Sequence, residues 1–192
     1  MRFHLETERL VLRQFRESDL EAFLAYRNDP EVAKYQGWSI PYSKEKGIEF
    51  VQKMSVAVAE QSKWLQIAVE LKSTRAMIGD VAFFIKRGDE RQAMIGYSLS
   101  QPYWGNGYAY EAVSCLLAYL FDELDLHRVI AECDEENVAS WKLLEKLGFR
   151  QEAHLIENLF FKGMYCNEYH YAMLGREWKE RHSSQRGEAE AV

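Results

Sequence analysis

Hydrophobic and polar residues alternate in short segments along the first half of the chain. Residues 9–15 (RLVLRQF) show the period of two that is typical of a half-buried strand. Three further strand candidates follow at 64–71, 77–85 and 92–100. The short turn sequences at 72–74 and 87–89 favour an antiparallel meander, because strands joined by tight turns run in opposite directions.

Two or three helices are expected between the first strand and this meander. Ser18 and Glu21 have the spacing of a capping box, in which two side chains satisfy amides at the start of a helix. A short helix is expected after Pro30, and a longer one from about Ser43. The longer helix is expected to bury Ile48, Val51, Met54 and Val58.

The helical period is strongest from Ala109 onward. The apolar positions there are 109, 112, 113, 116, 117, 120, 121 and 124. This nearly unbroken stripe of i, i+3 and i+4 spacings predicts an amphipathic helix. A strand is expected at 127–133, then a helix at 137–147 that begins at an Asn137 cap and ends at Gly148.

The order of these elements predicts a mixed α/β (α+β) fold with a mostly antiparallel central sheet. The strand at 92–100, the long helix and the strand at 128–133 form a β-α-β unit, whose strands are expected to be parallel. Two more strands, at about 149–157 and 165–174, complete the fold. A single domain is expected over 1–180 of the 192 residues, with a polar, flexible tail over 181–192.

Composition and charge narrow the class of function. The formal net charge of −6 disfavours nucleic acid as the main partner and is compatible with a cationic substrate. Neither a secretory signal nor a membrane span is expected, because no apolar stretch is long enough. Cys115, Cys133 and Cys166 lack metal-ligand spacing, which favours reduced thiols and a cytoplasmic location, with no metal site.

The stretch PYWGNGYAYEA (102–112) combines a glycine-containing loop with the start of the long helix. Amides at a helix N-terminus have no intrahelical partner, and the helix dipole adds partial positive charge there. Gly105 and Gly107 would let a bulky anion such as a pyrophosphate approach the backbone. The spacing is neither GxGxxG nor a Walker loop, and by itself it favours a plain turn and an anion site about equally.

A second segment, NVASWKLLEKLGF (137–149), decides between these two interpretations. Together with ETERLVLRQFRESD, MIGY and WGNGYAYEA, in this order and spacing, it resembles the GCN5-related N-acetyltransferase (GNAT) superfamily, specifically its RimJ/RimL-like branch. The resemblance spans nearly the whole chain. It implies a parallel β-α-β cleft that binds acetyl-CoA, with helices on both faces of the sheet.

The resemblance also implies which residues hold acetyl-CoA. The backbone amides of the glycine loop are expected to bind the pyrophosphate: Trp104, Gly105, Asn106, Gly107, Tyr108 and Ala109. The main chain at Leu99, Ser100 and Gln101 is expected to pair with the pantetheine arm, and Asn137 to contact the cofactor from the other side. Trp104 stands where the superfamily usually has glutamine or arginine, a change that backbone binding tolerates.

The implied reaction is direct attack of an uncharged primary amine on the thioester, without a covalent intermediate. A backbone amide near Leu99 is the expected oxyanion donor. Ser140 is a candidate to protonate the departing thiolate, although a hydroxyl is also ordinary at this helical position. Met94 replaces the glutamate of many relatives, so Glu157 is the candidate general base, with Glu132 or a water relay as alternatives.

The sequence does not decide which amine accepts the acetyl group. The resemblance implies a protein N-terminus of the ribosomal-protein type, but Asn167 replaces an aspartate that is frequent in relatives. A small amine (polyamine, amino acid or aminoglycoside) and a non-catalytic CoA-binding module are the alternatives.

Tyr35, Trp38 and Tyr42 belong either to the region that covers the acceptor in this superfamily or to the core. Dimers are common in the superfamily, and the strand at 165–174 could offer an edge for one.

Overall fold

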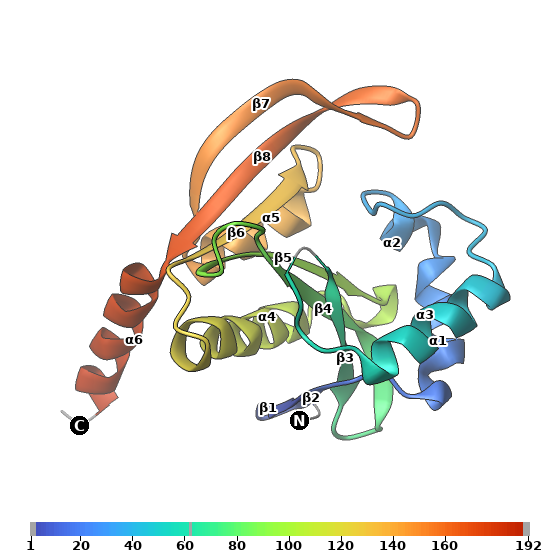
Figure 1. Ribbon diagram of the computed structural model, residues 1–192, viewed down its shortest axis with the longest axis horizontal. Helices are drawn as coiled ribbons and strands as arrows, with labels where there is room; N and C mark the ends of the chain where they lie inside the picture. Colours follow the sequence, from blue (N-terminus) through green and yellow to red (C-terminus); the bar gives the residue numbers. More distant parts are fainter. Residues whose placement is uncertain (1–2, 62, 190–192) are drawn as a thin grey trace. The chain divides into compact units, whose positions relative to one another are not determined.

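The computed structural model describes residues 3–61 and 63–189, and its strands form one sheet of eight in the order β1-β2-β3-β4-β5-β6-β8-β7 (Figure 1). The strands are β1 (His4–Glu6), β2 (Leu10–Arg13), β3 (Leu65–Leu71), β4 (Ala76–Ile85), β5 (Gln92–Leu99), β6 (Arg128–Asp134), β7 (Arg150–Phe161) and β8 (Met164–Leu174). The β5–β6 pair is parallel, and the pairs β1–β2, β2–β3, β3–β4, β6–β8 and β7–β8 are antiparallel. The mixed, mostly antiparallel fold expected from the sequence is therefore confirmed.

The α-helices of the described residues are α1 (Leu20–Arg27), α2 (Pro30–Ala33), α3 (Lys44–Val56), α4 (Tyr108–Ala118), α5 (Val138–Leu147) and α6 (Gly175–Ala189). Five of these six, α1 to α5, occur where the hydrophobic pattern predicts them. A π-helical turn, Tyr119–Glu123, extends α4. No helix in the described part of the chain is long and apolar enough to cross a membrane.

Contacts between residues group the chain into two compact units. The first, here called the N-terminal unit, comprises Met1–Phe84 and Ile95–Leu116. The second, the C-terminal unit, comprises Ile85–Met94 and Leu117–Val192. The single domain expected over 1–180 stays a prediction.

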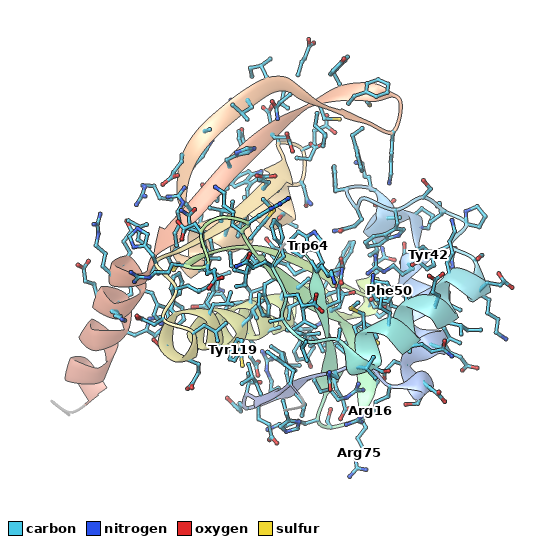
Figure 2. The ribbon with its side chains drawn as sticks, in the orientation of Figure 1. Arg16, Tyr42, Phe50, Trp64, Arg75 and Tyr119 are labelled. Atoms are coloured by element: carbon cyan, nitrogen blue, oxygen red, sulfur yellow. The ribbon has the colours of Figure 1, made fainter. Side chains whose placement is uncertain are left out.

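The N-terminal unit has an aromatic core between α1, α3 and the sheet. Phe23 is fully buried and packs its ring on Phe50 and Tyr42, with centroids 4.7 and 5.7 Å away; the last two are labelled in Figure 2. The guanidinium of the buried Arg27 lies 3.6 Å from the ring centre of Trp38. The Trp38 indole also donates a hydrogen bond to the Arg27 carbonyl, so Trp38 and Tyr42 serve the core.

The predicted capping box at Ser18 is wrong. Asp19, not Ser18, accepts the hydrogen bond at this turn, from the amide of Arg16 at 2.7 Å. The Asp19 carboxylate is also bound at 2.7 Å by Arg13, a buried side chain from β2. This buried ion pair selects the aspartate over the exposed serine, because an unpaired buried charge would be costly.

The expected burial along α3 is correct for only half of its positions. Val51 and Met54 are buried, whereas Ile48 and Val58 are 37% and 57% exposed. The helix ends at Val56, so Val58 lies beyond the helical face that the pattern assumes. The expected start of this helix at about Ser43 is confirmed, and the Ser43 side chain accepts a hydrogen bond from the Lys46 amide.

In the C-terminal unit, β6 pairs with β8 along its whole length and with β5 only through Gln92–Met94, which pair with Arg128–Ile130. The helix α5 begins at the Asn137 cap and ends at Gly148, whose φ of 97° lies in the left-handed region, as predicted. The last two strands are longer than expected and form the long hairpin drawn in orange in Figure 1.

Two predictions about the ends of helices need correction. The chain from Gly175 to Ala189 is the helix α6 and not a tail from 181; residues 190–192 lie outside the described part. The apolar stripe of the long helix is buried from Ala112 through Phe121, but Ala109 is half-buried and Leu124 is 38% exposed. The π-helical turn ends at Glu123, so Leu124 no longer follows the helical period.

Candidate active site

The glycine loop joins β5 to α4 within the N-terminal unit. Gly105 and Gly107 have φ angles of 75° and 78°, in the left-handed region that favours glycine. A Cβ at Gly105 would meet nothing within 4 Å, and one at Gly107 would meet only the Arg9 side chain, at 3.5 Å. The space beside both glycines is therefore open to a bulky group.

The amides of this loop are available as donors. The amides of residues 105–109 donate to no acceptor among the described residues. The first bond of α4 runs from the Glu111 amide to the Gly107 carbonyl, at 3.1 Å. Free amides just before and at the start of a helix of eleven residues, reinforced by its dipole, suit an anion such as a phosphate.

Trp104 has a specific structural role in this loop. Its indole Nε1 donates to the Leu99 carbonyl at 2.8 Å, and its own carbonyl accepts from the Asn106 side chain at 2.9 Å. The Ser100 amide meanwhile donates to the Ile78 carbonyl at 2.8 Å. Some of the main-chain groups expected to pair with pantetheine thus already have protein partners, whereas the Gln101 amide has none in the described part of the chain.

Asn137 belongs to the C-terminal unit, between β6 and α5. Its Oδ1 accepts from the Ser140 amide at 3.3 Å, which confirms the predicted N-cap. Its own amide donates to the Asp134 carbonyl at 3.0 Å. The side-chain Nδ2 is therefore the group that Asn137 has left to donate to a ligand.

Ser140 lies beside Cys133 and is half-buried. Burial raises the pKa of the Cys133 thiol to about 11, although its hydrogen bond with Ser140 lowers the value. A buried thiol that stays protonated at neutral pH is a poor nucleophile. The structure therefore agrees with core packing for Cys133 and gives it no covalent role.

Glu157 is exposed and occupies a bulge in β7, where the register with β8 shifts between Leu155 and Leu159. Its φ of 49° is left-handed, which is uncommon for a glutamate. Its amide donates to the Asn167 side chain at 2.8 Å. Asn167 thus holds the backbone of this bulge, and the bulge in turn directs the Glu157 side chain.

A cluster that the sequence did not predict lies on β6 and β8. Glu132 pairs with His170 in the register, and Glu168 lies two residues from His170 on the same face of the strand. One carboxylate oxygen of each glutamate and one ring nitrogen of His170 lie within 4.8 Å of one another. Asn158 donates to the buried Glu168 carboxylate at 2.5 Å. Alternation along 165–174 was a visible signal, but the strand register was needed to place Glu132 opposite His170.

Comparison with known proteins places the chain in a family. The model of the acetyltransferase (GNAT) domain matches residues 9–150. The chain is 33% identical over 175 residues to an uncharacterized N-acetyltransferase of Bacillus subtilis, YnaD, covering 91% of this chain and 99% of that one.

Solved structures agree with this match. A GNAT-family acetyltransferase from Bacillus anthracis is 32% identical with a TM-score of 0.80, covering 91% of this chain and all (100%) of that one. The fold is also that of the spermidine N-acetyltransferase from Vibrio cholerae, solved with CoA and spermine, at 24% identity and a TM-score of 0.76 over 90% of this chain and 99% of that one. The chain therefore belongs to the GNAT family and is an acetyl-CoA-dependent N-acetyltransferase.

Proposed function

We propose that this protein transfers the acetyl group of acetyl-CoA directly to a primary amine, and that the glycine loop holds the pyrophosphate of the donor. The row of free amides from Gly105 to Ala109, next to two left-handed glycines, carries this proposal. Leu99, Ser100 and Gln101 would align the pantetheine arm, and the Nδ2 of Asn137 would donate to the cofactor.

For the acceptor we propose a protein N-terminus first, because of the RimJ/RimL-like motifs. A small cationic amine is the second candidate. The cluster of Glu132, Glu168 and His170 favours it, since two carboxylates on one face of neighbouring strands attract an ammonium group. The spermidine-acetylating relative is consistent with this second class of acceptor.

Two side chains are proposed to move protons. Ser140 would donate a proton to the departing thiolate, and Glu157 would accept the proton of the amine. Support for Ser140 comes from its hydroxyl group, which interacts with the thiol of Cys133 on β6. Support for Glu157 comes from the bulge, since bulges recur next to active sites, where they redirect a side chain. Glu132 is the alternative proton acceptor.

Release of CoA, measured with peptides bearing free N-termini and with polyamines, amino acids and aminoglycosides, tests the function and the acceptor together. Turnover is expected with one class of amine and not with matched N-acetylated compounds. Binding of acetyl-CoA without turnover of any amine in the panel would favour the non-catalytic module instead.

Ser140→Ala is expected to lower kcat by about 100-fold or more, as loss of one proton-transfer group does, with little change in the KM for acetyl-CoA. The matched control is Ser55→Ala in α3, where the hydroxyl donates only to the Gln52 carbonyl. Unchanged turnover in Ser140→Ala would remove Ser140 from the mechanism.

The cytoplasmic location and the homodimer expected from the sequence stay predictions.

A further inference from the structure

Arg9, in the connection between β1 and β2, lies against the glycine loop of the same unit. Its Nη1 donates to the Asn106 carbonyl at 3.0 Å, and its Nε donates to the Glu111 carboxylate at 2.6 Å. The guanidinium also covers the Tyr108 ring, 4.6 Å from its centre. One side chain thus contacts the loop, the first residue of α4 and the first turn of that helix.

Glu111 anchors Arg9 in this position. Its carboxylate accepts from the Thr7 hydroxyl at 2.5 Å and from the Arg9 amide at 2.9 Å, in addition to the guanidinium. Partial burial raises the pKa of Glu111, but the hydrogen bonds from Thr7 and Arg9 outweigh it and hold the pKa below its usual value. The carboxylate therefore stays charged at neutral pH, and the ion pair with Arg9 stays intact.

A carboxylate in the first turn of α4 would by itself repel an anion bound at the helix N-terminus. Arg9 compensates this charge at close range, so the partial positive charge of the free amides keeps its effect. The bond to the Asn106 carbonyl also restrains the peptide between the two left-handed glycines. Charge and loop shape thus depend on the same side chain.

One guanidinium nitrogen of Arg9 has no acceptor in the part of the chain that the structure describes. The Nη2 atom lies 3.5 Å from the place of a Cβ on Gly107 and donates to none of the described residues. We propose that Arg9 is a positioning residue for the acyl donor, which fixes the glycine loop through Asn106 and Glu111 and leaves Nη2 for a phosphate oxygen. This inference rests on the proposed binding of acetyl-CoA at the loop.

Lysine could not replace Arg9 fully. The planar guanidinium reaches Glu111 and Asn106 in different directions and still has a donor left, whereas an ammonium group is a point charge without this fork. Arg9→Lys should therefore keep part of the electrostatic effect and lose the restraint on the loop.

The test measures the Kd of CoA by calorimetry for Arg9→Ala, Arg9→Lys and the wild type. Arg87→Ala is the control, because it removes an exposed arginine that has no ion pair among the described residues. Arg9→Ala is expected to raise the Kd about 10- to 100-fold, the effect of losing a charge-assisted hydrogen bond. The Kd of Arg9→Lys should lie between those of Arg9→Ala and the wild type, and the Kd of Arg87→Ala should equal that of the wild type.

Steady-state kinetics with an acetyl donor that lacks phosphates distinguish a role of Arg9 at the phosphate site from a general structural role. The KM for acetyl-CoA should rise in Arg9→Ala with kcat nearly unchanged, whereas the KM for S-acetylpantetheine should stay the same. An equal rise for both donors, or Kd values in both Arg9 variants that match Arg87→Ala, would overturn the role of Arg9. A wild-type protein that binds no CoA would instead contradict the proposed function itself.

Discussion

At the residue scale, the surroundings of a side chain decide its chemistry more than its type does. Of the three cysteines, Cys133 is buried and the other two are partly exposed, and burial raises the pKa of Cys133 to about 11. Gly105 and Gly88 both have left-handed φ angles, of 75° and 83°, yet one precedes a helix with free amides and the other lies in a turn between two strands. Two predictions follow from these environments.

Cys133 is expected to react slowly with thiol reagents. At pH 8 only about one thiol in a thousand would be ionised when the pKa is near 11, and the thiolate is the reactive form. Mass spectrometry after brief alkylation of the native protein checks this, with the unfolded protein as the control. Cys133→Ser should keep most of the acetyltransferase activity. A complete loss of activity in a folded variant would indicate instead that Cys133 forms a covalent acyl-enzyme.

Gly105→Ala is expected to weaken CoA binding at least tenfold, because a methyl group would enter the space that the pyrophosphate needs. Gly88→Ala is a matched control, since a Cβ there also meets nothing within 4 Å. Both variants should lose about 1 kcal/mol of unfolding free energy through the left-handed backbone. Urea unfolding and calorimetry compare them, and equal CoA affinity in both would support a loop that only turns the chain.

At the element scale, an ion pair connects the strands β6 and β7. Glu152 of β7 binds Arg128 of β6 and, at 2.6 Å, Arg150 of its own strand. The hydrogen bond from Arg128 is the main cause that lowers the pKa of Glu152 to about 2; partial burial opposes it, and Arg150 adds to it. Arg128 thus has its charge paired within the sheet.

Glu152→Gln is expected to lower the unfolding free energy by about 0.5–1 kcal/mol at pH 7, the usual range for a partly exposed ion pair. The folded pKa is depressed, so this stabilisation is present above the unfolded pKa of about 4.3. It is lost as the pH falls toward about 2. Urea unfolding of wild type and variant from pH 7 to pH 2.5 measures the difference, with Glu8→Gln, at an exposed position, as the control. If the difference in unfolding free energy between wild type and Glu152→Gln did not shrink in acid, the low pKa assigned to Glu152 would be contradicted.

At the scale of the whole molecule, the pattern of hydrophobic residues predicted the element order from β2 to β8 and the parallel β5–β6 pair, but not the strand β1. The β-α-β pattern is local, so a single sequence carries it. It missed the capping role of Asp19, which depends on a buried Arg13, and the helix α6, whose polar composition hid it. Among the residues with a proposed function, the glycine loop and Asn137 were predicted from the sequence, whereas Arg9, Glu168 and His170 were not.

Acetyl-CoA is expected to stabilise the whole molecule, because a ligand that binds only the folded state raises the unfolding free energy. At 100 times its Kd the gain is about 2.7 kcal/mol. For a chain of this length, that corresponds to a rise in Tm of roughly 5–10 °C. Differential scanning fluorimetry over a concentration series measures the rise, with acetylated pantetheine as the comparison ligand. The absence of any shift at millimolar acetyl-CoA would contradict donor binding.

The sequence by itself determined the helices α1 to α5, the strands β2 to β8 and the glycine loop, because periodicity and glycine placement act over a few residues of chain. Only the tertiary structure decided which distant groups meet. Arg9 and Glu111 are separated by 102 positions, and Glu132 lies opposite His170 only through the register of β6 with β8. Pairings of this kind depend on how the sheet assembles, which no local pattern specifies.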